Sequence, residues 1–492
     1  MILLDKEEIV EETEREFASS SLLNSNPLVQ HLEKPSEEFT KEDIVKFVKG
    51  KDIQILNLCH VAEDGRLKTL SFVINNEKYL TQVLEGGERV DGSSLFSYID
   101  VSESDIFVLP IYRTAFINPF NAIPTLNILC EYFDRNGKPL EFSPRNILRK
   151  AGKKLLNKTG VTLEALPELE FYVIFKREKE PLYPGVPQKN YHESTPFAKC
   201  EPLRNEVMTT LAKCGVPVKY SHSEVGLIPT DEFVMEQHEI EFLLQPFEVV
   251  ADTLTIAKWV IRNIGAKYGV TISFAPKLMV GHAGNGMHIH MRGLKNRKSI
   301  MTNTNRELTK EAKRMIGGIL KFAPSLTAFG NTVPVSYLRL VPHQEAPTYL
   351  CWGYRNRSAL VRIPALKQTL EFRSPDASAN IYLLLAGVTV AVEHGLTNNQ
   401  VLKLADDLYV DTNVYDDKKV QAKLKELPGS CYESAEYLEK DKPLYEKENV
   451  FPREVLDGTV RKLKNYEDEK LGETLKDVDK ANEFMKRYIH CG

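Results

Sequence analysis

The stretch Val280-Gly-His-Ala-Gly-Asn-Gly-Met-His-Ile-His-Met291 joins a glycine-rich segment to a short alternating pattern. In an extended strand, His288 and His290 would point to one face and the apolar side chains at 287, 289 and 291 to the other. The glycines before the strand would let the backbone turn sharply or approach a ligand closely. The pattern predicts either a small-molecule site with two imidazoles on one face or a core strand whose histidines form local hydrogen bonds.

Carboxylates occur at the same alternating spacing in other predicted strands. Residues 166–174 and 237–242 each place two glutamates on one face, and a glutamate and an arginine share a face near residue 371. Neighbouring carboxylates raise each other's pKa unless a cation lies between them. A solvated strand face is the alternative, but the surrounding apolar residues argue against full exposure. The carboxylates are Glu168, Glu170, Glu224, Glu239, Glu241 and Glu371.

Four arginines and two further acidic residues complete the set of candidate site residues. Glu345 lies on a loop bracketed by prolines, which predicts either a lid over a site or a surface carboxylate. Asp91 lies in the turn Val90-Asp-Gly-Ser-Ser94, and most such turns are only turns. The arginines are Arg339, on a predicted strand, and Arg357, Arg362 and Arg373.

If these polar faces converge, the glutamates and His288 would bind divalent cations opposite the arginines. Oxygen ligands with a single imidazole suit Mg²⁺ or Mn²⁺ better than zinc, and so many carboxylates predict two or more ions per site. Arginines bind carboxylate or phosphate in a bidentate manner, and metal ions facing arginines are typical of phosphoryl transfer. The sequence lacks both Gly-x-x-x-x-Gly-Lys-Ser/Thr and Gly-x-Gly-x-x-Gly, so a nucleotide would be held in another way.

A rival interpretation takes His288, His290 and Glu371 as a facial triad for non-haem iron in a β-barrel oxygenase. This hypothesis leaves the other glutamates and the arginines without a role. It is therefore the weaker of the two.

Composition limits the classes of partner and compartment. The 492 residues carry a net charge of -4, with basic residues dispersed along the chain, so we expect neither nucleic acid nor a membrane as partner. Seven cysteines without a Cys-x-x-Cys pair, and an acidic N-terminus unlike a secretory signal, predict a cytoplasmic protein with reduced thiols. The longest apolar run, residues 381–392, is too short to span a bilayer and predicts a buried helix.

The chain length predicts two unequal domains. Residues 1–45 are interpreted as an N-terminal helical extension. Residues 46–145 contain short β-rich runs separated by turns and predict a small, mostly β domain that ends at the helix start Ser143-Pro144. Residues 146–492 would form the larger domain, whose charged helices beyond residue 400 would support assembly.

The motifs together resemble the glutamine synthetase family in its bacterial type I form, over about residues 50 to 480. Nine stretches occur in the family's order: Asp91-Gly-Ser-Ser, Glu168-Leu-Glu-Phe, His222-Ser-Glu-Val, Gln237-His-Glu-Ile, Gly284-Asn-Gly-Met-His-Ile-His, Ser336-Tyr-Leu-Arg-Leu-Val-Pro, Glu345-Ala-Pro, Asn356-Arg-Ser-Ala and Glu371-Phe-Arg-Ser-Pro-Asp. The resemblance implies an α+β fold: a small N-terminal β-grasp domain, followed by a large catalytic domain with an antiparallel open barrel flanked by helices. It also implies a dodecamer of two hexameric rings with active sites shared between subunits.

The resemblance also implies a role for each site residue. Two metal sites would be formed, one by Glu170, Glu224 and Glu239, and one by Glu168, His288 and Glu371. Gly284 and Arg339 would bind glutamate, Arg362 would assist at the phosphates, and Arg357 and Arg373 would stabilise the transferring phosphoryl group. Asp91, from the adjacent subunit, and Glu345 would bind ammonium and accept its proton.

The implied reaction is ATP-dependent ligation of ammonia to L-glutamate through γ-glutamyl phosphate. Two alternatives stay open: a γ-glutamyl-amine ligase that uses an organic amine, and a non-catalytic assembly paralogue. Several positions depart from the family pattern: Ala283 replaces an expected asparagine and Ser223 an expected histidine, and the spacing from Glu224 to Glu239 is about seven residues longer than usual.

Overall fold

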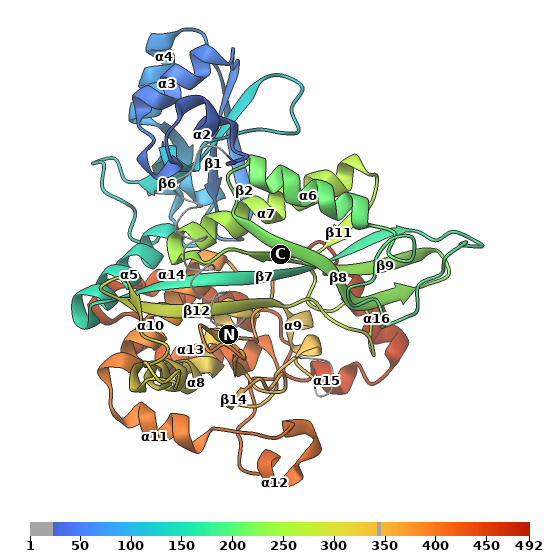
Figure 1. Ribbon diagram of the computed structural model, residues 1–492. Coiled ribbons are helices and arrows are strands. Elements are labelled where there is room, and N and C mark those ends of the chain that lie inside the picture. Colours follow the sequence, from blue (N-terminus) through green and yellow to red (C-terminus); the bar gives the residue numbers. More distant parts are fainter. Residues whose placement is uncertain (1–22, 342–345) are drawn as a thin grey trace. The chain divides into compact units, whose positions relative to one another are not determined.

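The computed structural model describes residues 23–341 and 346–492 (Figure 1). The chain divides into two compact units. The first comprises the residues up to Ser143 together with Asn205–Lys219 and Asp252–Ile264. The second comprises Pro144–Arg204, Tyr220–Ala251 and Gly265–Gly492. Two helices contribute residues to both units: α6 (Glu201–Lys213) and α7 (Phe247–Lys267).

The first unit is built on a sheet with strand order β2-β1-β6-β4-β3, in which β5 also pairs with β6. Strands β1 and β6 run parallel, and the other described pairs are antiparallel. The elements are α2 (Pro27–Leu32), α3 (Lys41–Gly50), β1 (Ile55–Val61), β2 (Leu67–Val73), α4 (Glu77–Gly86), β3 (Glu88–Asp91), β4 (Asp105–Pro110), β5 (Phe116–Ile117) and β6 (Thr125–Phe133).

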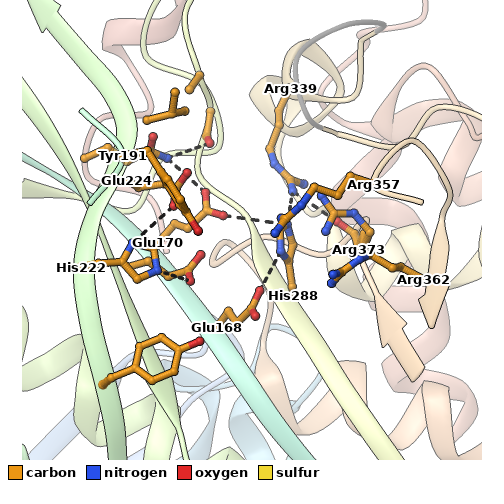
Figure 2. A pocket seen from close by; sticks show the side chains of 16 residues that line it. Glu168, Glu170, Tyr191, His222, Glu224, His288, Arg339, Arg357, Arg362 and Arg373 are labelled. Carbon is orange, nitrogen blue, oxygen red and sulfur yellow. Dashed lines mark hydrogen bonds and ion pairs between the residues drawn. The ribbon is translucent and has the colours of Figure 1, made fainter. Parts of the chain in front are cut away.

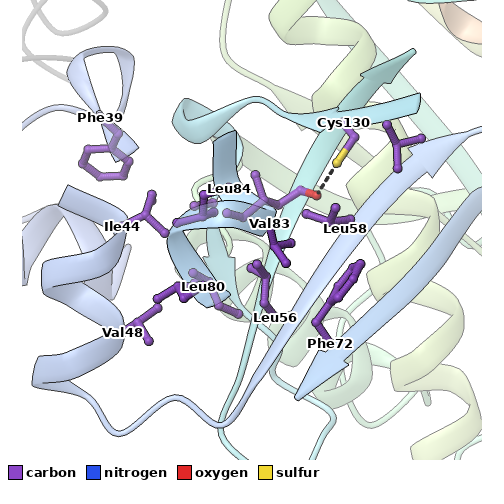
Figure 3. Close-up of a cluster of buried hydrophobic side chains, with 14 of the residues drawn as sticks. Phe39, Ile44, Val48, Leu56, Leu58, Phe72, Leu80, Val83, Leu84 and Cys130 are labelled. Atoms are coloured by element: carbon purple, nitrogen blue, oxygen red, sulfur yellow. Dashed lines mark hydrogen bonds between the residues drawn. The ribbon is translucent and has the colours of Figure 1, made fainter. Parts of the chain in front are cut away.

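Helices α3 and α4 provide the apolar faces that cover this sheet. The sequence pattern predicts only short strands and turns over the residues that form α4. A capping box begins α3, because the Asp43 carboxylate accepts from the Thr40 backbone N–H (2.8 Å) and Thr40 Oγ1 accepts from that of Asp43 (3.3 Å). Side chains at helical spacing then meet the strand residues in one core (Figure 3), which includes Ile44, Val48, Leu80, Val83, Leu84, Leu56, Leu58 and Phe72.

The second unit contains a larger curved sheet with strand order β14-β15-β16-β12-β7-β9-β8, to which β10, β11 and β13 add short edges. Strands β14 and β15 run parallel, and the pairs of β7 with β9 and β12, and of β16 with β12 and β15, are antiparallel. The strands are β7 (Val161–Lys176), β8 (Val218–Pro229), β9 (Phe233–Phe242), β10 (Gln245–Pro246), β11 (Thr271–Ser273), β12 (Met287–Lys295), β13 (Lys298–Ser299), β14 (Trp352–Tyr354), β15 (Val361–Ile363) and β16 (Leu370–Phe372).

Helices of the second unit pack together beside β7 and β12 (Figure 1). Helix α10 packs against α8 and α5, and α13 packs against α8 and α14. The helices are α5 (Pro144–Thr159), α8 (Lys310–Gly330), α9 (Pro334–Arg339), α10 (Ile381–Thr397), α11 (Gln400–Asp407), α12 (Lys418–Gln421), α13 (Cys431–Tyr445), α14 (Arg453–Lys464), α15 (Leu471–Thr474) and α16 (Val478–Lys486).

The predicted apolar run is confirmed as the buried helix α10. Within the described ranges, no single helix is long and apolar enough to cross a membrane. Helices α10 and α11 pass that test only as a pair bent by 108°.

The prediction that Arg339 lies on a strand is wrong. Pro334 takes the first position of α9, where its fixed φ favours a helix and its missing N–H costs nothing, and Arg339 is the last residue of that helix. The short run of apolar residues before Arg339 therefore belongs to a buried helix and not to a strand.

Candidate active site

A pocket of about 390 Å³ in the second unit collects nearly all of the predicted site residues (Figure 2). Carboxylates and His222 occupy one wall, arginines occupy the facing wall, and His288 lies between them. The lining residues are Glu168, Glu170, Tyr191, Tyr220, His222, Glu224, Val225, Gln237, Glu239, Ala283, Gly284, His288, Arg339, Arg357, Arg362 and Arg373.

Sheet register explains why residues far apart in sequence meet here. Glu170 on β7 is paired with Glu239 on β9, and Glu168 on β7 is paired with His288 on β12. On the other edge of β12, His290 is paired with Glu371 on β16. Because alternate residues of a strand share a face, each strand turns its polar residues to the same side.

The first candidate metal group contains His222, Glu224 and Glu239, whose ligand atoms lie within 4.8 Å of one another. His222 Nε2 is 3.1 Å from Glu239 Oε1, and its Nδ1 is 3.6 Å from Glu224 Oε2. Burial, with the negative charges of Glu170 and Glu239, raises the pKa of Glu224 to about 8. Burial and the surrounding glutamates also raise the pKa of Glu239 well above its usual value. Buried carboxylates that repel one another in this way fit a site built around a cation.

The second candidate group contains Glu168, His290 and Glu371, with His288 beside them. Glu168 Oε2 is 3.1 Å from His288 Nδ1, and its Oε1 is 3.1 Å from His290 Nε2. The predicted ligands Glu168, His288 and Glu371 thus lie together, and His290, which was left out of that set, lies with them. The two strand-face imidazoles predicted from the alternation are confirmed as neighbours.

The arginine wall is fixed by carboxylate and carbonyl groups. Arg362 Nη1 donates to Glu371 Oε2 (2.6 Å), and Arg373 Nη1 donates to Glu371 Oε1. Burial would raise the pKa of Glu371, but Arg373 and His290 hold this pKa at about 2. Glu371 is therefore ionised, and its two oxygens retain lone pairs that could accept a metal ion.

Arg339 is 3% exposed and is held by the backbone. Its Nη1 donates to the Ser374 carbonyl oxygen (2.8 Å) and its Nη2 to that of Arg373 (3.2 Å). Arg339 therefore presents a buried, preoriented guanidinium to the pocket, which is suitable for gripping a carboxylate ligand.

The glycine-rich segment is tied to the carboxylate wall by Gln237. Its Nε2 lies 3.1 Å from Glu170 Oε2 and 3.0 Å from the Gly284 carbonyl oxygen, and the Gly286 N–H donates to Glu170 Oε2 (2.7 Å). At Gly284, a Cβ atom would lie 2.3 Å from the Pro276 carbonyl oxygen, so only glycine fits. Gln237 is a site residue beyond those predicted, and its position two residues before Glu239 on one strand face is the sequence signal that could have identified it.

Comparison with known proteins identifies the family. The model of the glutamine synthetase catalytic domain matches residues 141–482, and that of the glutamine synthetase β-grasp domain matches residues 52–135. The chain belongs to the glutamine synthetase family. It is an enzyme of a family of ATP-dependent ligases that use divalent metal ions, and the predicted α+β fold with its N-terminal β-grasp domain is confirmed.

Relatives in this family match along most of their length. A glutamine synthetase of Thermotoga maritima is 33% identical over 82% of this chain and 90% of its own. One of Thermococcus kodakarensis is 32% identical over 87% of this chain and 94% of its own. Among solved structures, a Plasmodium falciparum glutamine synthetase shares the fold, with a TM-score of 0.76 and 22% identity over 90% of this chain and 98% of that one. A GmaS/ADP complex has a TM-score of 0.71 and 19% identity over 88% and 96%.

Asp91, one of the two residues that the family resemblance assigned to ammonium, lies outside the pocket lining. Asp91 ends β3 in the first unit, where its carboxylate accepts from the hydroxyls of Ser93 (2.7 Å) and Ser94 (2.6 Å). These hydrogen bonds lower the pKa of Asp91 to about 2, so it is ionised at neutral pH. Glu345 lies outside the described residues.

Aromatic residues that the sequence analysis did not single out line the carboxylate end of the pocket. Tyr191 stacks on His192 with ring centroids 4.2 Å apart and meets His222 edge-on at 5.3 Å. Tyr220 also lines the pocket, and Tyr191 and Tyr220 are 53% and 46% exposed. A tyrosine in a proline-rich loop carries no strand or helix period, so no sequence signal pointed to it.

Proposed function

We propose that this enzyme joins ammonia to the γ-carboxylate of L-glutamate in an ATP-dependent reaction that releases glutamine, ADP and phosphate. The observation that carries the proposal is a pocket in which buried, mutually repelling carboxylates face a wall of arginines. That charge arrangement suits a substrate whose transferring group is a phosphoryl bound by metal ions and guanidinium groups.

In the first proposed step, a γ-carboxylate oxygen of glutamate attacks the γ-phosphorus of ATP, and ADP leaves. Arg339 holds the substrate carboxylate beside Gly284, and Arg357 and Arg373 neutralise charge on the transferring phosphoryl group while Arg362 assists at the phosphates. Two divalent cations, Mg²⁺ or Mn²⁺, would supply further neutralising charge when bound. Glu170, Glu224 and Glu239 would hold one of them, and Glu168, His288 and Glu371 the other.

In the second proposed step, ammonia attacks the acyl carbon of γ-glutamyl phosphate, and phosphate leaves with the electrons of the broken bond. Ammonium must first lose a proton, and the carboxylates of Asp91 and Glu345 would bind the cation and accept that proton. We assign Asp91 to a neighbouring subunit of a type I dodecamer composed of two hexameric rings. This assembly would complete each site.

The remaining assignments follow the same proposal. We divide the chain into an extension (1–45), a β-grasp domain (46–145) and a catalytic domain (146–492). All seven cysteines lie in the described ranges as thiols and six of them are buried, which supports a cytoplasmic location.

A second candidate function is ligation of an organic amine to glutamate. The observation that favours it is the pair of exposed tyrosines, Tyr191 and Tyr220, beside the carboxylate wall. Aromatic faces next to carboxylates can bind an alkylammonium group through cation–π attraction.

Release of phosphate from ATP by the purified protein with Mg²⁺ or Mn²⁺ and glutamate tests these candidates. We expect turnover that depends on ammonium, yields glutamine and falls in Asp91→Ala and Glu345→Ala variants. Turnover with an organic amine alone would favour the second candidate. No turnover with any amine would leave a non-catalytic assembly paralogue.

A further inference from the structure

A further buried group of ionisable side chains, separate from the two candidate metal groups of the pocket, lies behind the first of them. It contains Cys200, Glu236 and His238, with ligand atoms within 4.8 Å of one another, and Arg204 at its edge. Glu236 and His238 alternate along β9 with Gln237 and Glu239, so they point away from the pocket. Glu236 and His238 are fully buried and Arg204 is 7% exposed, and the proposed reaction uses none of them.

Direct contacts between Arg204, His238 and Glu236 hold this group together. Arg204 Nη1 lies 3.0 Å from His238 Nδ1, and because an arginine can only donate, Nδ1 must accept. Burial lowers the pKa of His238, so the ring is neutral and its proton lies on Nε2, 3.2 Å from Glu236 Oε1. Glu236 also accepts from the backbone N–H groups of Lys199 (2.8 Å) and Cys200 (3.0 Å).

Arg204 connects this group to the strand that carries Glu224. The same Nη1 atom donates to Ser223 Oγ on β8 (2.8 Å), and Ser223 Oγ donates to the carbonyl oxygen of Glu193 (2.9 Å). Ser223 directly precedes Glu224, and His238 directly precedes Glu239. One guanidinium in the first turn of α6 therefore links β8 and β9 at the residues next to two carboxylates of the pocket.

The Ser223 backbone extends the link to His222, the histidine of the first candidate metal group. Its carbonyl oxygen lies 3.0 Å from His222 Nδ1, which directs Nε2 of that ring toward Glu239. Ser223 stands where the family pattern expects a histidine, and here its small hydroxyl accepts a hydrogen bond from the Arg204 guanidinium. The contact is thus a feature of this chain's own sequence.

We propose that Arg204 is a positioning residue that sets the spacing of Glu224 and Glu239 and thereby the affinity of the pocket for a divalent cation. This inference rests on the proposed metal-dependent function. Arg204 is not one of the residues that line the pocket, and its influence passes through Ser223 and His238. Partners behind metal ligands often contribute about 10- to 100-fold to metal affinity.

A positioning role and a purely electrostatic role of Arg204 predict opposite changes in metal affinity when the Arg204 guanidinium is removed. A positive charge behind a cation site repels the ion, so if charge alone mattered, Arg204→Met would bind metal more tightly. If Arg204 holds the strands in place, Arg204→Met binds metal more weakly, and Arg204→Lys, which keeps one donor, lies between this variant and the wild type.

Titration of the metal-free full-length protein with Mn²⁺ alone, followed by electron paramagnetic resonance of the unbound ion, tests this proposal. We expect Arg204→Met to weaken Mn²⁺ binding by about 10-fold or more. The Mn²⁺ concentration for half-maximal phosphate release should rise in parallel, while kcat at saturating Mn²⁺ stays close to that of the wild type.

Lys154→Met is the matched control. Lys154 is also a buried cation of the second unit, and its Nζ pairs with Glu393 Oε2 on α10 (3.0 Å), outside the pocket lining. Its loss should lower the melting temperature and leave Mn²⁺ affinity unchanged. Ser223→Ala removes a single hydrogen bond and serves if Arg204→Met does not fold, and it too should weaken Mn²⁺ binding.

The outcomes separate this inference from the proposed function. Wild-type protein that binds Mn²⁺, together with folded Arg204 and Ser223 variants of equal or higher affinity, would overturn the positioning role alone. Wild-type protein that binds no Mn²⁺ would overturn the metal-dependent function, and the positioning role with it.

Discussion

Glu170 on β7 and Glu239 on β9 are directly paired across two antiparallel strands, so two buried carboxylates face the same pocket from neighbouring strands of the sheet. Burial and the negative charges of the neighbouring glutamates raise the pKa of Glu239 well above its usual value, so an ionised Glu239 is unfavourable in the pocket by itself. The strain of this arrangement is relieved either by protonation or by a cation, and pH and metal should therefore compete for the site.

Stability without metal should fall as pH rises. The pKa of Glu224 is raised to about 8, above its unfolded value of about 4.5, so the folded state holds an extra proton between these pH values. The contribution of Glu224 to the free energy of unfolding is complete below about pH 4.5 and is lost as the pH rises through about 8, with a slope of up to about 1.4 kcal/mol per pH unit.

Urea unfolding in EDTA, from pH 5 to pH 8.5, measures this effect as the difference between wild type and Glu224→Gln. The free energy of unfolding should fall less with rising pH in the variant than in the wild type. Saturating Mn²⁺ should reduce the pH dependence of the wild-type free energy of unfolding. Glu164→Gln is the control, because Glu164 is a strand glutamate of the same sheet, on β7, but pairs with Arg292 (2.9 Å) outside the pocket lining. Equal slopes in all three proteins would contradict the assignment.

Replacement of Arg339 by lysine should impair glutamate binding selectively. Lysine keeps the charge but loses the planar fork that contacts the Ser374 and Arg373 carbonyl oxygens. We expect KM for glutamate to rise by about 30-fold or more, as for loss of a buried, charge-assisted contact, with a much smaller change in KM for ATP. A parallel rise in both KM values would argue that Arg339 supports the whole pocket instead.

Gly284→Ala should abolish activity, because its Cβ would lie 2.3 Å from the Pro276 carbonyl oxygen and force the loop away from Gln237. Gly152→Ala is the matched control: this glycine lies inside α5, and its Cβ would meet nothing within 4 Å. That change should keep full activity and stabilise the protein by roughly 0.5–1 kcal/mol. Steady-state rates and thermal melting of both variants check the pair.

Gln237→Met should weaken metal and glutamate binding together. Methionine has a similar length but no donor, so the Glu170 carboxylate and the Gly284 carbonyl lose a shared hydrogen-bond partner. We expect about a 10-fold loss in Mn²⁺ affinity, measured by titration, and a comparable rise in KM for glutamate. A change in only one of the two constants would show that Gln237 does not couple the carboxylate wall to the glycine-rich segment.

The sequence by itself determined which side chains could act together on each strand. Alternation is a local property of an extended backbone, so the shared faces of Glu168 with Glu170, and of His288 with His290, could be predicted without knowing any neighbour. The chemistry of carboxylates, imidazoles and arginines then indicated divalent cations and a phosphoryl group, and the order of nine motifs indicated the family.

Only the tertiary structure decided which strands are neighbours and what supports them from behind. Register pairs Glu170 with Glu239 and His290 with Glu371 across long stretches of sequence, and local patterns contain no information about such pairings. The helical position of Arg339 depends on packing around Pro334, and the contacts of Arg204 with Ser223 and His238 arise where a helix meets two strands. Burial and close packing, rather than residue spacing, create these relationships.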